Sequence, residues 1–298
     1  MNLNHSIKKP KKKSKKKTKK VIKGKPKIRQ SQSVRQSKPQ IINLDAVNFS
    51  LLCDKSEKLY KKTIGSIIKP SEKIKIIHDA KTYLMKICNC GNDYLLFFTS
   101  GEIESNIIFL CSAVNAYKKL RKIKPHVVIS SVENESIITY ANSLKDSNQI
   151  ELTFIKPNIY GCILSDDIDH LLKPNTCCVL ITYINKELGS VNNMEKISSI
   201  LHKKKIPLHS DCSYLFGKHK LDLKKINVDA ITISFNKING PIGMGALIIK
   251  KDLLNGYKLY EHSTMLENKI TENIPAIMSS IESVKNSLIQ RKEKNIKI

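Results

Sequence analysis

Two polar residues of this sequence have the types and the spacing for covalent chemistry. Asp211 ends a strand-like run, and Lys237 follows the next such run 26 residues later. A lysine in a partly buried, glycine-flanked turn loses hydration, which lowers its pKa and favours Schiff-base formation. Each residue also has an ordinary interpretation, because strand-end carboxylates are usually solvated and most of the 48 lysines must lie on the surface.

The pair suits an aldehyde cofactor. Pyridoxal 5′-phosphate (PLP) is held in proteins by a lysine Schiff base and by an aspartate on its pyridinium nitrogen, so Asp211 and Lys237 predict a PLP site. The segment Thr99-Ser100-Gly101-Glu102 joins a strand to a helix, where backbone N–H groups bind phosphate well. That signal is weak by itself, and the segment is not a Walker loop because no Gly-Lys-Ser/Thr sequence follows.

The elements that position these residues alternate between strand and helix from about Ile41. Strands are expected at 94–98, 126–131, 151–155, 177–183, 206–210, 230–234 and 246–250. Helices are expected from 103 and at 133–144, 165–173 (with Ser165 as N-cap), 193–203 and 274–291. The pattern predicts an α/β fold with a mostly parallel central sheet and helices on both faces. Ligands in such folds bind beyond the carboxyl ends of the strands.

The first 40 residues differ in composition from the rest. They hold 14 Lys, two Arg and no acidic residue, a charge of +16 out of +26 for the 298-residue chain. With few apolar side chains they cannot offset the entropy of ordering, which predicts a disordered tail at 1–40 and a folded domain at 41–298. Residues 8–38 predict sequence-independent binding of nucleic acid or another polyanion. A nuclear localisation signal and a solubilising segment are the alternatives.

Other classes of protein are disfavoured by the sequence. It has no apolar run of about 18 residues for a membrane span and no apolar stretch typical of a secretory signal. We expect an intracellular protein, cytoplasmic or nuclear (or carried in a virion if the source is viral), and not secreted. Eight cysteines are scattered, several in apolar runs, which predicts reduced thiols. Cys88 and Cys90 could form half of a metal site, but no second close pair completes it.

Several stretches, in order and with matching spacing, resemble the cysteine desulfurase branch of the class V aminotransferase family. Phe98–Asn106 is similar to the family pattern FTSGATESN, and Ser234–Leu247 to SGHKIYGPKGIGAL. The other matching stretches are 42–45, 127–134, 185–189 and 209–212. The resemblance covers about residues 40–250. It implies the PLP-dependent transferase fold (fold type I), PLP as cofactor, a homodimer and an amino-acid substrate.

The resemblance also implies a role for each matching residue. Lys237 matches the lysine that forms the Schiff base, Asp211 the aspartate on the pyridinium nitrogen, and Ser234 a serine that binds the phosphate. Further implied cofactor contacts are Ser100, Gly101, Glu102, Asn134, Asn185, Lys186, Tyr214 and Asn236. In this family a cysteine on a mobile loop attacks the substrate sulfur to form a persulfide.

Five positions depart from the family pattern. Residues that contact the phosphate, stack on the ring or bond to the cofactor are replaced here by Ile103, Asn134, Lys186, Tyr214 and Asn236. Ile103 removes a hydroxyl donor, and Asn134 offers no aromatic face. Tyrosine and lysine can still donate hydrogen bonds, so some of the changes are substitutions rather than losses. Together they predict weakened or altered binding of PLP.

The C-terminal part of the sequence bears on activity. The family's small C-terminal domain carries the cysteine loop and an arginine for the substrate carboxylate, and neither is visible after Lys250. The last cysteine is Cys212. We therefore expect the small domain to be largely absent and desulfurase activity to be weakened or lost, which describes a pseudoenzyme in the extreme case. The alternatives are an active PLP enzyme on an amino acid, with Lys237 as its lysine, and a polyanion-binding protein that uses its basic tail.

Overall fold

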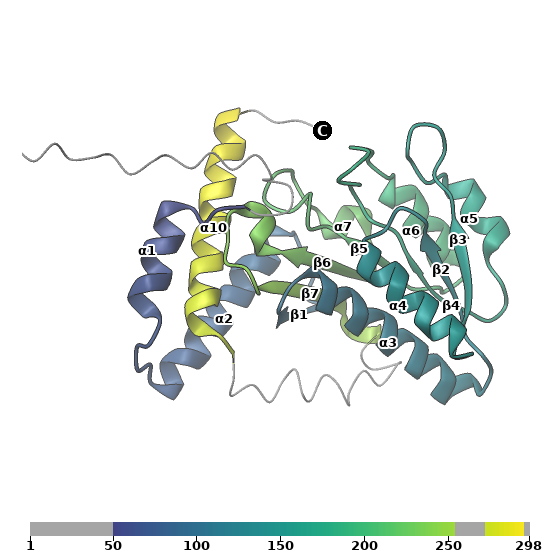
Figure 1. Ribbon diagram of the computed structural model, residues 1–298, viewed down its shortest axis with the longest axis horizontal. Coiled ribbons are helices and arrows are strands. Elements are labelled where there is room, and N and C mark those ends of the chain that lie inside the picture. The colour runs from purple at the N-terminus through teal and green to yellow at the C-terminus, as the bar shows by residue number, and fades with distance from the viewer. Residues whose placement is uncertain (1–49, 254–271, 295–298) are drawn as a thin grey trace, which may run out of the picture. The chain divides into compact units, whose positions relative to one another are not determined.

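The fold is seen in a computed structural model that describes residues 50–253 and 272–294 (Figure 1). The strands are β1 Tyr94–Thr99, β2 His126–Ser130, β3 Glu151–Ile155, β4 Thr176–Leu180, β5 Leu208–Asp211, β6 Ala230–Ser234 and β7 Gly245–Lys250. The helices are α1 Asp54–Thr63, α2 Pro70–Ile87, α3 Glu102–Arg121, α4 Glu135–Asp146, α5 Ser165–Leu171, α6 Met194–Lys203, α7 Leu223–Ile226 and α10 Ile274–Lys294, with a 3-10 turn, η1, at Phe235–Ile238.

The strands form one sheet in the order β1-β7-β6-β5-β4-β2-β3. Neighbours from β3 to β6 run parallel, whereas β7 is antiparallel to both β1 and β6. Strand β1 therefore points the same way as β6, so the carboxyl ends of β1 to β6 lie at one edge of the sheet, which we call the carboxyl edge. The predicted α/β fold with a mostly parallel sheet is confirmed.

Helices cover both faces of this sheet, because successive strand residues point to opposite faces. In β4, Cys178 and Leu180 join the apolar cluster beneath α3 and α4, whereas Val179 joins the cluster beneath α2, α6 and α10. The strands are apolar on both sides for this reason, as expected for parallel strands between two helical layers. The prediction of helices on both faces is confirmed.

Helices α1 and α10 lie side by side although they are far apart in sequence (Figure 1). Small side chains allow the close approach, since the Ser56 hydroxyl donates to the carbonyl of Ser279 at 2.8 Å. Ser283, one turn further along α10, donates to the carbonyl of Asn239 at 2.8 Å. Because Asn239 directly follows η1, this bond ties the turn that carries Lys237 to the helical layer.

Most predicted elements occur within a few residues of their expected bounds. The expected N-cap of α5 is wrong: Leu164 occupies that position, and the Ser165 hydroxyl donates to the carboxylate of Asp166 at 3.0 Å instead of accepting from a backbone amide. Helices α1, α2 and α7 were not predicted. Within the described ranges no helix has the length and apolarity to cross a bilayer. The same ranges hold no group of three His, Cys, Asp or Glu side chains placed to bind a metal.

Candidate active site

The predicted site residues gather at the carboxyl edge, on the loops that follow different strands. Ser100, Gly101 and Glu102 follow β1, Asn134 follows β2, Asn185 and Lys186 follow β4, Asp211 and Tyr214 end or follow β5, and Ser234, Asn236 and Lys237 end or follow β6. This is the edge at which parallel α/β sheets bind ligands. The sheet thus brings together residues spread over more than 130 positions of sequence.

Lys237 lies in η1 with a buried side chain. The turn is tight, since Asn239 adopts a left-handed conformation with φ of 60°. A Cβ at Gly240 would lie 2.6 Å from the carbonyl oxygen of Phe235, so only glycine fits there. The Lys237 ammonium lies 3.4 Å from a carboxylate oxygen of Glu102, and the two side chains are only 7% and 13% exposed.

The neighbours of Lys237 set its charge. Burial lowers the pKa of Lys237, but a hydrogen bond with Tyr214 and the carboxylate of Glu102 outweigh it and raise the pKa above its usual value. The ammonium also lies 5.1 Å from the centre of the Tyr214 ring, which favours the cation further. Lys237 is therefore a protonated, paired side chain. The sequence-based expectation of a pKa lowered by burial alone is wrong, because it did not foresee Glu102 and Tyr214 as partners.

Asp211 is a buried carboxylate at the end of β5. The Asn106 side-chain amide donates to one of its oxygens at 3.1 Å, and the Ser213 backbone N–H donates to the other at 2.9 Å. Burial raises the pKa of Asp211, hydrogen bonds from Ser213 and Asn106 lower it, and the charge of Glu102 raises it, so that the net shift is upward. The side-chain oxygen of Asn106 is itself buried and has no hydrogen-bond partner among the described residues.

The start of α3 supplies donors for an anion. The first amides of a helix have no carbonyl of their own helix to bind, and Gly101 at the N-cap has φ of 150°, which favours glycine. Gly245 lets β7 approach this loop, because a Cβ there would lie 2.6 Å from the Cα of Gly101. The Ser234 hydroxyl donates to the side-chain oxygen of Asn236 at 2.8 Å. The Ser100 backbone N–H already donates to the carboxylate of Glu104 at 2.5 Å, and Glu102 adds a second carboxylate at the first position of the helix.

Two asparagines, Asn134 and Asn185, stabilise the loops that follow β2 and β4. The Asn134 side chain caps α4 by accepting from the amide of Ser136 at 3.1 Å. Asn185 donates to the carbonyl of Val132 at 2.7 Å and so joins the loop after β4 to the loop after β2. Lys186 lies 3.9 Å from the carboxylate of Glu187.

A cavity of about 480 Å³ opens between these loops. Its lining includes Asp211, Tyr214, Asn134, Asn185 and Lys186, together with Ser131, Val132, Glu133, Glu135, Ile138, Thr182, Ile184, Glu187 and Leu188. The volume suits a small cofactor or substrate. Tyr214 connects the cavity to Lys237, since its ring lines the cavity and contacts the ammonium.

Sequence reasoning gave no cofactor role to two residues of this site. Asn106 holds the carboxylate of Asp211, and Glu133 accepts a hydrogen bond from the amide of Thr182. Both lie in stretches that resemble the family patterns, which was the available signal. Their partners follow other strands and are distant in sequence, so no local pattern could pair them.

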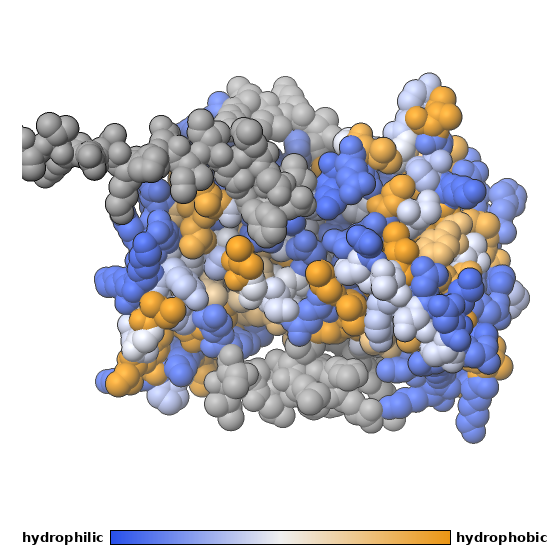
Figure 2. Space-filling model, in the orientation of Figure 1, coloured by the Kyte–Doolittle hydropathy of each residue, from blue (hydrophilic) through white to orange (hydrophobic). Residues whose placement is uncertain are grey.

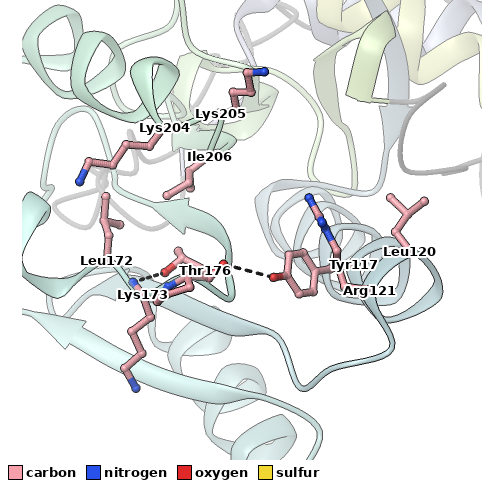
Figure 3. Close-up of a pocket in the computed structure, with 10 residues that line it drawn as sticks. Tyr117, Leu120, Arg121, Leu172, Lys173, Thr176, Lys204, Lys205 and Ile206 are labelled. Atoms are coloured by element: carbon pink, nitrogen blue, oxygen red, sulfur yellow. Dashed lines mark hydrogen bonds between the residues drawn. The ribbon is translucent and has the colours of Figure 1, made fainter.

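A second cavity, of about 560 Å³, lies at the opposite edge of the sheet (Figure 3). It is lined by Arg121, Lys204 and Lys205, with Tyr117 and Ile206 among its other residues. Its cations, Lys173 included, lie in or just after the last turns of α3, α5 and α6, where positive charge offsets the negative helix ends. No carboxylate or thiol is among its described lining residues, so the chemistry belongs to the carboxyl edge.

The residues at the carboxyl edge fit the ring and aldehyde ends of PLP. Asp211 offers a buried carboxylate to a ring nitrogen, Asn106 carries an unpartnered buried oxygen beside it, and Lys237 supplies an amine. A buried lysine and a buried aspartate at the carboxyl ends of one sheet, beside a helix start, are the groups that a PLP site requires.

Comparison with known proteins identifies the family. The family model "Aminotransferase class-V" matches residues 53–276, and the chain belongs to this family of PLP-dependent proteins. A cysteine desulfurase IscS of Plasmodium falciparum (isolate 3D7) is 35% identical over 180 residues, which are 60% of this chain and 32% of that protein. A mitochondrial cysteine desulfurase of Saccharomyces cerevisiae (strain ATCC 204508 / S288c) is 29% identical over 175 residues, or 59% of this chain and 34% of that protein.

Solved structures agree on the fold. A structure of SspA in complex with cysteine has a TM-score of 0.71 and 23% identity, covering 80% of this chain and 71% of that chain. A NifS-like protein also has a TM-score of 0.71, with 19% identity, covering 83% of this chain and 70% of that chain. The predicted PLP-transferase fold and the resemblance to cysteine desulfurases are confirmed. The matches span about a third of the two desulfurases named above.

Proposed function

We propose that this chain binds PLP covalently through Lys237 and acts on an amino acid in the manner of a cysteine desulfurase, with reduced activity. One observation carries the proposal: a buried lysine follows β6 and a buried aspartate ends the neighbouring parallel strand β5, beside a cavity of about 480 Å³. Cysteine is the first substrate to test, because the structurally similar SspA was solved in complex with cysteine.

Each residue has a place in this proposal. Asp211 would hold the ring nitrogen, while Ser234 and the loop of Ser100 and Gly101 would bind the phosphate. When bound, PLP supplies an electron sink for negative charge at the substrate Cα. Tyr214, between Lys237 and the cavity, is placed to donate a hydrogen bond to the ring and to keep the lysine oriented.

Of the remaining predicted contacts, Asn134, Asn185 and Lys186 would line the ring and the substrate, and Asn236, bonded to Ser234, would lie at the phosphate. Asn134 is used as the cap of α4 and offers no aromatic face, and Glu102 brings negative charge to the phosphate end. No cysteine is among the described residues that line the cavity. A sulfur acceptor would therefore come from another segment or another protein, and these features together are the reason to propose reduced activity.

Covalent attachment at Lys237 tests the proposal directly. Purified protein incubated with PLP and reduced with borohydride should carry one pyridoxyl group, which peptide mass spectrometry places on Lys237. The Lys237→Ala variant should carry none, whereas Lys204→Ala, an exposed lysine paired with Asp169, should label like the wild type. Labelling spread over surface lysines, unchanged by Lys237→Ala, would show that the site does not hold PLP.

The reaction itself is read with amino acids as probes. Cysteine should give sulfide or enzyme-bound sulfane sulfur, whereas transamination or elimination would give a keto acid.

We also propose the homodimer that the family resemblance implies. Apolar side chains of Ile103, Leu188 and Ile242 are more than half exposed at the carboxyl edge, where a second copy would cover them.

A further inference from the structure

The buried ion pair between Lys237 and Glu102 occupies the part of the site that the proposed cofactor would need. Glu102 is the first residue of α3, yet its side chain turns inward to the lysine and not to solvent. An ion pair this buried is retained only with good geometry, since removing one partner leaves an uncompensated charge. The Lys237 ammonium and the Glu102 carboxylate therefore stay together as a pair inside the site.

The carboxylate of Glu102 competes with a phosphate for the same surroundings. Both anions are favoured by the positive start of α3. A phosphate at the start of α3 would meet two carboxylates: Glu104, which accepts from the Ser100 backbone N–H at 2.5 Å, and Glu102, the first residue of the helix, which lies 3.4 Å from Lys237. Like charges at a few ångströms in a protein cost several-fold to many-fold in affinity. A pyridoxal ring without phosphate meets no such repulsion.

Glu102 also disfavours the neutral, reactive form of the Lys237 amine. Attachment of an aldehyde to Lys237 forms a C–N bond and releases water, and it requires the neutral amine. The pair with Glu102 stabilises the ammonium form. The titratable and charged groups around this amine are Glu102 from α3 and Tyr214 and Lys218 from the segment after β5, and the charge of Glu102 also acts on Asp211.

We infer that Glu102 is a specificity-determining residue that opposes the phosphate of a B6 aldehyde and keeps Lys237 paired until the aldehyde displaces it. The inference rests on the proposed function, namely that Lys237 is the attachment point. The cofactor phosphate therefore contributes less binding affinity in this site than in a site with a neutral side chain at position 102. Glu102 is a positioning residue for Lys237 as well, since it acts on the amine through the ion pair.

The test compares two probes, PLP and pyridoxal, in the full chain. Glu102→Gln keeps the shape and removes the charge, and Asp54→Asn removes an exposed carboxylate from the first position of α1 as a matched control. Dissociation constants come from equilibrium titration, and borohydride reduction with mass spectrometry places each adduct. Glu102→Gln should bind PLP at least about tenfold more tightly, with a smaller gain for pyridoxal. The pH midpoint for attachment should fall for both aldehydes.

Each outcome decides the inference. It stands if the gain is larger for PLP than for pyridoxal, also when the wild type binds PLP too weakly to measure. It is overturned if Glu102→Gln binds PLP no better than the wild type, or gains the same factor for both aldehydes, or if Asp54→Asn reproduces the effect. If neither protein carries either aldehyde on Lys237, the proposed function fails as well. If the wild type is labelled at Lys237 and the variant gains nothing, only the role of Glu102 is wrong.

Discussion

Glu133 is a carboxyl group whose charge depends on the fold. It lines the candidate cavity and accepts a hydrogen bond from the backbone N–H of Thr182. Burial raises the pKa of Glu133, the bond from Thr182 lowers it, and the charge of the neighbouring Asp211 raises it, so that the net pKa is about 8. At neutral pH the cavity therefore holds a protonated carboxyl that can donate a hydrogen bond to a ligand.

This pKa predicts a dependence of stability on pH. The unfolded chain loses the Glu133 proton near pH 4.5, whereas the folded chain keeps it up to about pH 8. Between these values the unfolded state binds fewer protons, so the contribution of Glu133 to the free energy of unfolding falls as pH rises. Urea denaturation from about pH 5 to about pH 8 should therefore give a flatter profile for Glu133→Gln than for the wild type. Parallel profiles would mean that Glu133 is ionised in the folded state.

Some residues of the site could be predicted from the sequence, whereas their contacts with one another could not. Asp211 and Lys237 were found because strand ends and a glycine-flanked turn are local signals. The ion pair of Lys237 with Glu102 was not foreseen, because these residues follow β6 and β1, which become neighbours of β7 only in the assembled sheet. The charge of Lys237 depends on that long-range contact, and so its predicted pKa shift had the wrong sign.

At the scale of elements, β7 controls where α3 begins. Gly245 starts β7 opposite Thr99 of β1 and Ser234 of β6, and its Cα hydrogen faces the Gly101 backbone. A Cβ at this position would lie 2.6 Å from the Gly101 Cα and 2.8 Å from the carbonyl oxygen of Ile233. Both contacts are with backbone, so a side chain cannot turn away from them. The start of α3 and the end of β6 keep their separation only with glycine here.

The Gly245→Ala variant tests this packing. Forcing a methyl group against backbone should lower the free energy of unfolding by about 1–3 kcal/mol and should weaken attachment of PLP at Lys237, since the phosphate loop is displaced. Gly243→Ala is the matched control: Gly243 has φ of 77° but open space around its Cβ position, so its cost is backbone strain of about 1–2 kcal/mol. Denaturation and borohydride labelling measure both effects. Equal labelling in the two variants would contradict the role given to Gly245.

Elements with strong apolar periods were predicted well, and the others were not. Most of the seven strands are rich in apolar residues, so their existence could be predicted from sequence alone, whereas β5 has only one apolar residue, Leu208. The antiparallel direction of β7 could not, because it is fixed by pairing with β1 far along the chain. Helix α1 buries only Ser56 among its own residues, so its contact with α10 depends on small polar side chains that carry no apolar signal.

At the scale of the whole molecule, charge is divided unevenly. The first 40 residues carry +16 and the remaining 258 residues carry +10. On the face drawn in Figure 2, polar side chains are mixed with scattered apolar ones. Many lysines of the folded part are paired with carboxylates, as Lys204 is with Asp169 and Lys225 with Glu195. Residues 8–38, for which polyanion binding is predicted, lie outside the described residues, and so does the whole segment 1–40.

Because the charge of the first 40 residues has no acidic partner within that segment, we expect it to dominate binding to nucleic acid. Lysines that neutralise phosphates release counterions, so affinity should fall steeply with salt, by about 10³–10⁵-fold from 50 to 200 mM if 6–10 phosphates are contacted. Removing residues 1–40 should abolish most of this affinity and flatten its salt dependence, while PLP labelling of Lys237 should stay unchanged. Fluorescence anisotropy with DNA duplexes of unrelated sequence measures the binding. Equal affinity across those duplexes is expected, because few aromatic side chains interleave the lysines to stack on bases. If the shortened chain keeps the salt-dependent affinity, the basic residues of the folded part bind the nucleic acid, and residues 1–40 do not.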